Sequence, residues 1–251
     1  MKIKKLLVLG AINPGAIEHL FINGFIKHGV EVDHFDIYDR YIASIRRSIG
    51  HKVINKISPS IFYQSINRDL LQFVTGKTYD VILVFKGMEI FPETLGKLKN
   101  HTILLANFNG DHPFIYFFPG SGNKNVLNGL PFFDAHFSYS KSIVKRLVAE
   151  IKTNAFWIPF GYDSNVSAPS SIPGVTYGGN VVFIGAYDHE RAAYIDKMKN
   201  PLLHIYGDEK WKSRNFRRPF VQQAYQGRSL YGSDYKDAIS NSMGVINLLR
   251  E

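Results

Sequence analysis

The sequence contains no cysteine, and this absence removes several kinds of chemistry at once. A disulfide framework, a zinc site built on thiolates and a cysteine nucleophile are all excluded. A chain without cysteine also fits a reducing compartment, and we expect a cytoplasmic protein. There is no Asp-x-Asp, and the nine histidines lack metal-ligand spacing, so the sequence predicts neither a metal site nor a cofactor.

Long hydrophobic runs are also missing. The longer ones, such as Val81–Phe85, are far shorter than the ~20 residues that cross a bilayer. The amino-terminal run Leu6–Leu9 is too short for a secretory signal and has no small-residue cleavage site. We therefore expect it to be the first buried strand.

What the sequence has in excess is positive charge, with 30 Lys and Arg against 21 Asp and Glu. Such a balance favours acidic partners, namely phosphates, nucleic acid or an anionic membrane. A first basic run, from Arg40 to Lys56, contains no acidic residue and is interleaved with Ile42, Ile45 and Ile49. It fits either a solvated surface or an amphipathic helix at the inner face of a membrane.

A second basic run, from Lys210 to Arg228, carries Trp211, Phe216 and Phe220. Aromatic side chains among basic ones can stack on the bases of a nucleic acid. No nucleic-acid-binding motif accompanies the run, so nucleic acid is not an expected partner.

Apolar runs alternate with helical patterns along most of the chain, which predicts an α/β fold of doubly wound parallel sheets. The predicted strands are Lys5–Gly10, Val30–Ile37, Tyr79–Phe85, Thr102–Asn107, Phe132–Tyr139, Ala155–Pro159, Val181–Gly185, Leu202–Tyr206 and Gly244–Leu249. The predicted helices are Gly15–His28, one ending at Leu70–Thr75, Pro92–Leu98, Lys141–Ile151, Glu190–Met198 and Ser233–Ser242.

A stretch rich in Ser, Pro and Gly interrupts this pattern and predicts a linker at 164–179. It separates a domain at 1–163 from a second at 180–251. The second contains three predicted strands, fewer than a doubly wound sheet usually has, so we expect it to be incomplete.

Glycine-rich turns follow several predicted strands, at the sheet edge where ligands bind. The first turn carries Asn13 and Gly15 and departs from the dinucleotide fingerprint, which disfavours an oxidoreductase. A plain tight turn explains it equally well. After the fourth strand come Asp111 and His112, which suit general acid–base catalysis or hydrogen bonding to a sugar, the alternative being a turn before Pro113.

The second half repeats this arrangement. Gly185 follows a strand and precedes a helix on which Arg191 could reach a diphosphate, although an exposed helical arginine is the plain alternative. Gly207 follows the next strand. Asn247 lies within an apolar run, where a buried amide must be satisfied by the fold or by a ligand.

Together these segments resemble the CgeB/YkvP-type, spore-maturation-like glycosyltransferases. The residues matching the family's order are Phe183, Gly185, Tyr187, Glu190, Arg191, Ile205, Tyr206, Gly207, Trp211 and Asn247. Upstream, the segments 106–114 and 157–163 look like the family's Asp-Asp-Pro segment and the end of its first domain, with Gly110-Asp111-His112-Pro113 as a departure.

This resemblance implies a GT-B fold, in which two Rossmann-like domains face each other across a cleft. It implies transfer of a sugar, without a metal, from a nucleotide-sugar donor to a glycan, protein or lipid acceptor, for instance in an envelope or spore coat. Asp111 and His112 would be catalytic, Asn13 and Gly15 would lie on the acceptor side, and the donor would contact Gly185, Tyr187, Arg191, Tyr206, Gly207 and Asn247.

The chain ends before the family's Arg-Thr-Phe-Glu segment, so we expect a carboxyl-terminal truncation that could leave the protein inactive by itself. The alternative function is a non-catalytic module, or an inactive fragment, that recognises phosphorylated ligands or an anionic membrane surface.

Overall fold

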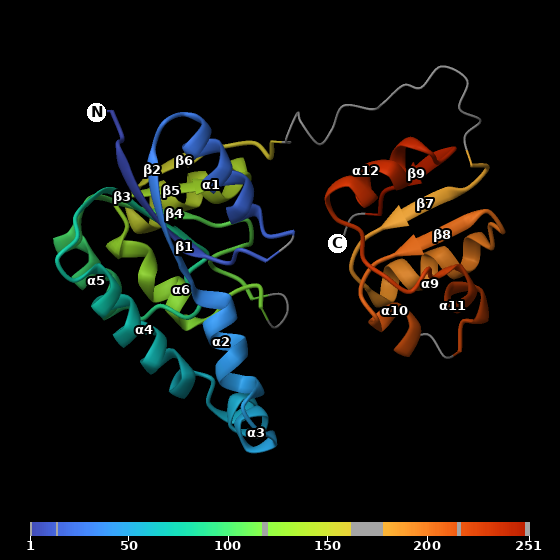
Figure 1. Ribbon diagram of the computed structural model, residues 1–251, viewed down its shortest axis with the longest axis horizontal. Helices are drawn as coiled ribbons and strands as arrows, with labels where there is room; N and C mark the ends of the chain where they lie inside the picture. The colour runs from blue at the N-terminus through green and yellow to red at the C-terminus, as the bar shows by residue number, and fades with distance from the viewer. Residues whose placement is uncertain (1, 14, 117–119, 162–177, 215–216, 249–251) are drawn as a thin grey trace. The chain divides into compact units, whose positions relative to one another are not determined.

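The structure, a computed structural model, describes residues 2–13, 15–116, 120–161, 178–214 and 217–248. They belong to two compact units, unit 1 (Met1–Gly161) and unit 2 (Tyr162–Glu251), each described here by itself (Figure 1). Apart from Gly178 and Gly179, the linker predicted at 164–179 lies outside the described residues.

Unit 1 is built on a sheet of six parallel strands in the order β2-β1-β3-β4-β5-β6. The strands are β1 (Lys5–Gly10), β2 (Glu31–Asp36), β3 (Tyr79–Phe85), β4 (Thr102–Phe108), β5 (Ala135–Ser138) and β6 (Asn154–Trp157). The direction of winding reverses between β1 and β3, and such a reversal opens a crevice at the carboxyl ends of the strands.

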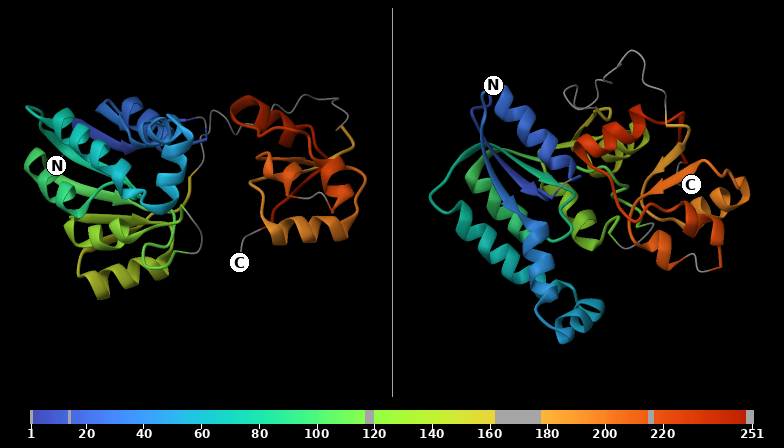
Figure 2. Two further views of the ribbon diagram at one scale, coloured as in Figure 1. Left: turned by 90° about the horizontal axis from the view of Figure 1, so that it is seen from below. Right: turned by 45° about the vertical axis from the view of Figure 1, so that its right-hand side comes forward.

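Helices cover both faces of this sheet (Figure 2). They are α1 (Ile17–Lys27), α2 (Ile37–Arg46), α3 (Ile49–Ile57), α4 (Ser60–Val74), α5 (Pro92–Leu98), α6 (Lys124–Gly129) and α7 (Lys141–Arg146). Short 3-10 helices span Lys99–His101 and Leu130–Phe132, and a π-helical turn spans Leu147–Ile151.

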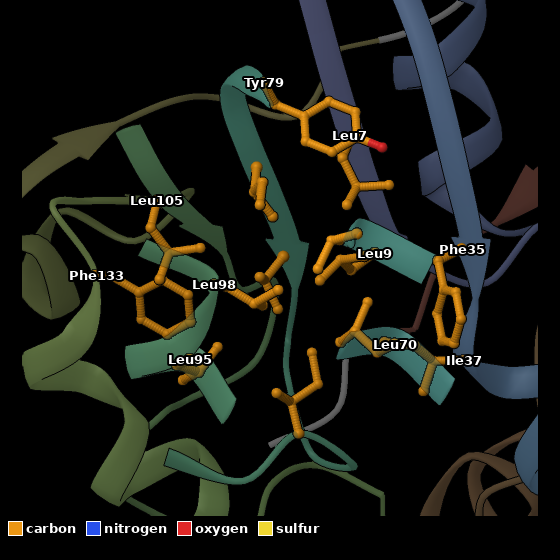
Figure 3. Close-up of a cluster of buried hydrophobic side chains, with 14 of the residues drawn as sticks. Leu7, Leu9, Phe35, Ile37, Leu70, Tyr79, Leu95, Leu98, Leu105 and Phe133 are labelled. Atoms are coloured by element: carbon orange, nitrogen blue, oxygen red, sulfur yellow. The ribbon is translucent and has the colours of Figure 1, made fainter. Parts of the chain in front are cut away.

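Alternation along β1 explains the layers, because successive side chains of a strand point to opposite faces. Leu7 and Leu9 pack with Leu70 of α4 and Leu95 of α5 (Figure 3). Leu6 and Val8 belong to the opposite cluster, which includes Ile22 of α1. Nearly unbroken apolar runs are expected of strands that are covered on both faces.

The first basic run, from Arg40 to Lys56, lies in α2 and α3, and α4 follows it. Side-chain caps begin the first two helices: Asp36 accepts the backbone N–H of Asp39, and Ser48 accepts that of His51. The strand predicted to reach Ile37 therefore ends at Asp36, where α2 begins.

Unit 2 has a parallel sheet of three strands in the order β8-β7-β9. Its elements are β7 (Val181–Ile184), α9 (His189–Met198), β8 (Leu203–Tyr206), α10 (Lys210–Ser213), α11 (Pro219–Ala224), α12 (Gly232–Ser240) and β9 (Gly244–Ile246). Phe183 and Ile205 pack against Ile195, Trp211 and Val221 in its core. In the described parts of both units, no helix is long and apolar enough to cross a membrane.

Candidate functional site

A cavity of about 280 Å³ opens at the carboxyl ends of β7 and β8 in unit 2. It is lined by Ile184, Gly185, Ala186, Gly207, Asp208, Ser229, Leu230 and Tyr231. The order β8-β7-β9 means that the chain winds to one side of β7 and then crosses to the other. The carboxyl end of β7 is therefore the place where an open α/β sheet binds its ligands.

The wall of this cavity contains bare backbone from two turns in direct contact. A Cβ built on Gly207 would lie 2.1 Å from the carbonyl oxygen of Gly185 and 2.6 Å from Nε1 of Trp211. The same indole Nε1 donates to the Gly185 oxygen over 2.9 Å, and Trp211 is fully buried. Glycine at 207 thus permits a packing that no side chain would allow.

Arg191 brings a positive charge to the first of these turns. Asp188 caps α9 by accepting the backbone N–H groups of Glu190 and Arg191 over 3.0 and 3.3 Å, which sets Arg191 in the first turn of the helix. Nη1 of Arg191 is 3.8 Å from the Cβ position of Gly185. The guanidinium therefore lies beside the turn that the sequence analysis assigns to a diphosphate.

The amino end of α12 adds a further feature that favours anions. Ser229, Leu230 and Tyr231 line the cavity and lead directly into the helix. The N-cap residue, Tyr231, provides no side-chain hydrogen bond. The first N–H groups of a helix and its dipole favour negative charge at this end.

Asp208 is a cavity residue that the sequence analysis missed. Its Oδ1 accepts the backbone N–H of Lys210 over 3.1 Å, and its Oδ2 accepts that of Tyr187 over 3.4 Å. The carboxylate therefore joins the turn after β8 to the turn after β7. The signal in the sequence was the position of Asp208, which directly follows the glycine at the end of a strand and lies two residues before a helix.

The other predicted donor residues lie around the cavity or away from it, and none of them lines it. The ring of Tyr187 packs edge-on against Trp211, with centroids 5.4 Å apart. The carbonyl of Tyr206 accepts the N–H of Gly185 over 2.9 Å. Asn247 follows the end of β9 and is exposed, so its interpretation as a buried amide inside a strand was wrong.

In unit 1, Asp111 pairs with a lysine from the neighbouring strand end, a partner that the sequence did not reveal. Nζ of Lys86 lies 2.5 Å from Oδ2 of Asp111 and donates to the Gly120 carbonyl over 2.7 Å. Lys86 has a φ of +57°, a backbone conformation that residues other than glycine and asparagine rarely adopt. Strained residues of this kind cluster at functional sites.

Asn109 positions the same loop. Its side chain is 4% exposed, and Oδ1 accepts the backbone N–H of Asp111 over 2.8 Å. Its Nδ2 has no hydrogen-bond partner among the described residues. A buried donor left without a partner is rare and costly, so this group suits a ligand that supplies an acceptor.

His112 turns back on its own loop, where Nδ1 accepts the backbone N–H of Phe114 over 3.3 Å. Burial, assisted by the nearby Arg146, lowers the pKa of His112 below its ordinary value. Burial therefore favours the neutral imidazole.

The turn after β1 is already occupied by a carboxylate. Oε1 of Glu18 accepts the N–H of Ala11 over 3.1 Å, and its Cγ is 2.7 Å from the Cβ position of Gly10. Gly15 has a φ of +96°, and the carbonyl of Asn13 accepts the N–H of Ala16. A carboxylate here disfavours a phosphate, so this turn differs from its counterpart in unit 2.

No group of three or more His, Asp or Glu side chains among the described residues could hold a metal ion.

No family model matches the sequence, and no curated protein matches it either. Solved structures do resemble the chain. A UDP-GlcNAc 2-epimerase from Neisseria meningitidis bound to UDP-GlcNAc has a TM-score of 0.57 at 13% identity, covering 96% of this chain and 76% of that one. A UDP-forming α,α-trehalose-phosphate synthase from Burkholderia xenovorans has a TM-score of 0.60 at 12% identity, covering 99% and 79%.

These likenesses extend over both units and establish the fold. The chain has an α/β fold with a Rossmann-like parallel sheet in each unit and a small second domain, and the structures that it resembles have GT-B folds. The fold class predicted from the sequence is confirmed. At 12 and 13% identity, the comparison concerns the fold alone.

Proposed function

We propose that the protein is a glycosyltransferase that uses a nucleoside diphosphate sugar as its donor. The observation that carries this proposal is the cavity of unit 2, where the Gly185 and Gly207 turns and the amino end of α12 converge, with Arg191 beside the Gly185 turn. Bare backbone lets a ligand approach closely, and the cation and helix terminus both favour a diphosphate.

The chemistry needs these features because transfer breaks the bond between the sugar C1 and the terminal phosphate oxygen. Negative charge grows on the diphosphate as that bond breaks. Donors fixed in advance at this position stabilise the transition state more than the ground state. Arg191 suits the task because a guanidinium can bind two phosphate oxygens at once.

We further propose that the nucleotide is uridine diphosphate. Two of the similar structures were solved with UDP-GlcNAc or UDP-2-fluoro glucose bound, and a third is of a UDP-forming synthase. The same fold in this chain supports a donor of this kind.

In this proposal, the acceptor binds unit 1 at the loop after β4. The hydroxyl oxygen of the acceptor bonds to the sugar C1 while the carboxylate of Asp111 takes the hydroxyl proton. The diphosphate leaves with the electron pair of the broken bond. Nδ2 of Asn109 is a donor available to an oxygen of the acceptor. Lys86 orients the carboxylate through their ion pair.

Calorimetric titration of the full chain with UDP, UDP-glucose and UDP-GlcNAc tests the donor site. We expect Arg191→Gln to weaken UDP binding by about tenfold or more. Lys197→Gln is the matched control, because Lys197 is exposed in the last turn of the same helix, and it should leave the affinity unchanged.

Product analysis separates the possible activities. Release of UDP together with a glycosylated acceptor supports transfer. An altered sugar still attached to UDP would show epimerisation instead, and binding without turnover would favour a non-catalytic module. Equal affinity of Arg191→Gln and the unmodified chain would refute the assignment of the donor site.

A further inference from the structure

Helix α3 displays an apolar stripe to solvent. Ile49, Val53 and Ile57 recur every four residues and therefore share one face of the helix. Their side chains are 81, 52 and 80% exposed, and the helix has no buried residue. Three aligned and exposed β-branched residues are unusual on a protein surface without a function.

The contacts of the opposite face fix this orientation. The hydroxyl of Tyr41 donates to Oδ1 of Asn55 over 2.8 Å, and the ring of His51 lies 5.7 Å from that of Phe62. These residues hold α3 against α2 and α4. Figure 1 shows α3 at the end of α2 that is farthest from the sheet of unit 1.

Positive charge surrounds the stripe. Arg46, Arg47, Lys52 and Lys56 are all exposed, and the sequence has no Asp or Glu between Arg40 and Asp69. Arg40 is paired with Asp69 over 3.7 Å. On the helix, Lys52 and Lys56 lie four residues apart, along one edge of the apolar stripe.

We propose that α3 binds the surface of an anionic lipid bilayer. The isoleucines would enter the boundary between headgroups and acyl chains, while the lysines and arginines would meet the lipid phosphates. Long basic side chains can reach the headgroups while their stems stay near the apolar region. An interfacial helix needs this combination of an apolar face and basic flanks, and two weak signals together give stable attachment.

The charges favour a bilayer over a protein partner. A protein groove for this helix would need an apolar floor and acidic walls on the same side. An anionic membrane offers an apolar layer and negatively charged headgroups over its whole surface. The inference is independent of the proposed activity, because no residue of α3 contributes to the cavity of unit 2 or to the Asp111 loop.

Sedimentation of the full chain with vesicles tests the electrostatic part. We expect binding to phosphatidylcholine vesicles that contain phosphatidylglycerol, little binding to pure phosphatidylcholine, and loss of binding at high salt. Lys52→Glu with Lys56→Glu should weaken binding more than about tenfold. The exposed pair Lys27→Glu with Lys145→Glu makes the same change in net charge elsewhere on unit 1 and should have a much smaller effect.

A second pair of variants tests the apolar part. Ile49→Ser with Ile57→Ser should weaken vesicle binding about tenfold or more at unchanged net charge. Ile26→Ser with Ile103→Ser is the control, since Ile26 and Ile103 are 56 and 68% exposed but lie outside the stripe. Equal losses in test and control pairs, or no binding to anionic vesicles at low salt, would overturn the proposal. UDP binding measured without lipid reports separately on the donor site.

Discussion

The carbonyl oxygen of Gly185 lies 2.1 Å from the position that a Cβ on Gly207 would occupy. The carbonyl cannot easily move away, because it accepts the indole N–H of the fully buried Trp211. The turns after β7 and β8 are therefore pressed together, backbone against backbone. Space alone requires glycine at 207, and this contact shapes one wall of the cavity.

We predict that Gly207→Ala destabilises unit 2 by about 3 kcal/mol or more, because overpacking of a rigid contact forces the backbone to shift. Urea unfolding followed by the fluorescence of Trp211 measures this change. Trp157 is the only other tryptophan in the sequence and lies in unit 1, so a Trp157→Phe background isolates the signal.

Gly244→Ala is the control in the same unit. Apart from the chain neighbours of Gly244, no atom of the described residues lies within 4 Å of its Cβ position. The free energy of unfolding should therefore change by less than about 0.5 kcal/mol. If Gly207→Ala proved as stable as this control, the contact between the two turns would not constrain the cavity.

Most of the strands could be predicted because burial on both faces leaves a simple mark, an unbroken apolar run such as Tyr79–Phe85. Helix α3 could not be predicted with the same certainty. Its isoleucines contact solvent rather than a core, so its pattern fits either a solvated surface or an interfacial helix. Its start depends on Ser48, whose capping role is visible only in the structure.

The site was predictable in part for a related reason. Gly185 and Arg191 are close in sequence and lie in one strand–turn–helix segment, and the structure places them together. Lys86 and Asp111 are brought together by the pairing of Phe85 with Phe108 on neighbouring strands. A partner that depends on the order of strands in a sheet leaves no local pattern in the sequence.

Asp111→Asn should lower kcat for sugar transfer about 10²- to 10⁴-fold, because an amide cannot take the proton of an attacking hydroxyl. The affinity for UDP should stay the same, because in this proposal the donor binds unit 2. Steady-state kinetics together with titration of UDP measures both quantities on one preparation.

Asp134→Asn is the matched control for this substitution. Asp134 is also paired with a lysine of unit 1, Lys99, over 2.7 Å, and it directly precedes β5. Its replacement should leave kcat within about twofold of the unmodified chain. Equal kcat values for the two variants would remove Asp111 from the catalytic step.

Stability should depend on pH through His136, whose side chain is 1% exposed in β5. Burial lowers the pKa of His136, and the hydrogen bond from Nε2 to the Leu130 carbonyl opposes this only in part. The unfolded chain therefore binds a proton more readily than the folded one as the pH falls below about 6.5, and the unfolding free energy decreases until the pH passes the folded-state pKa.

Urea unfolding at pH 8 and pH 5 should show this loss. His136→Gln should reduce it, since a glutamine amide can donate to Leu130 but does not titrate in this range. His28→Gln changes an exposed histidine and should keep the original difference between the two pH values. An undiminished pH dependence in His136→Gln would mean that other groups cause the acid sensitivity.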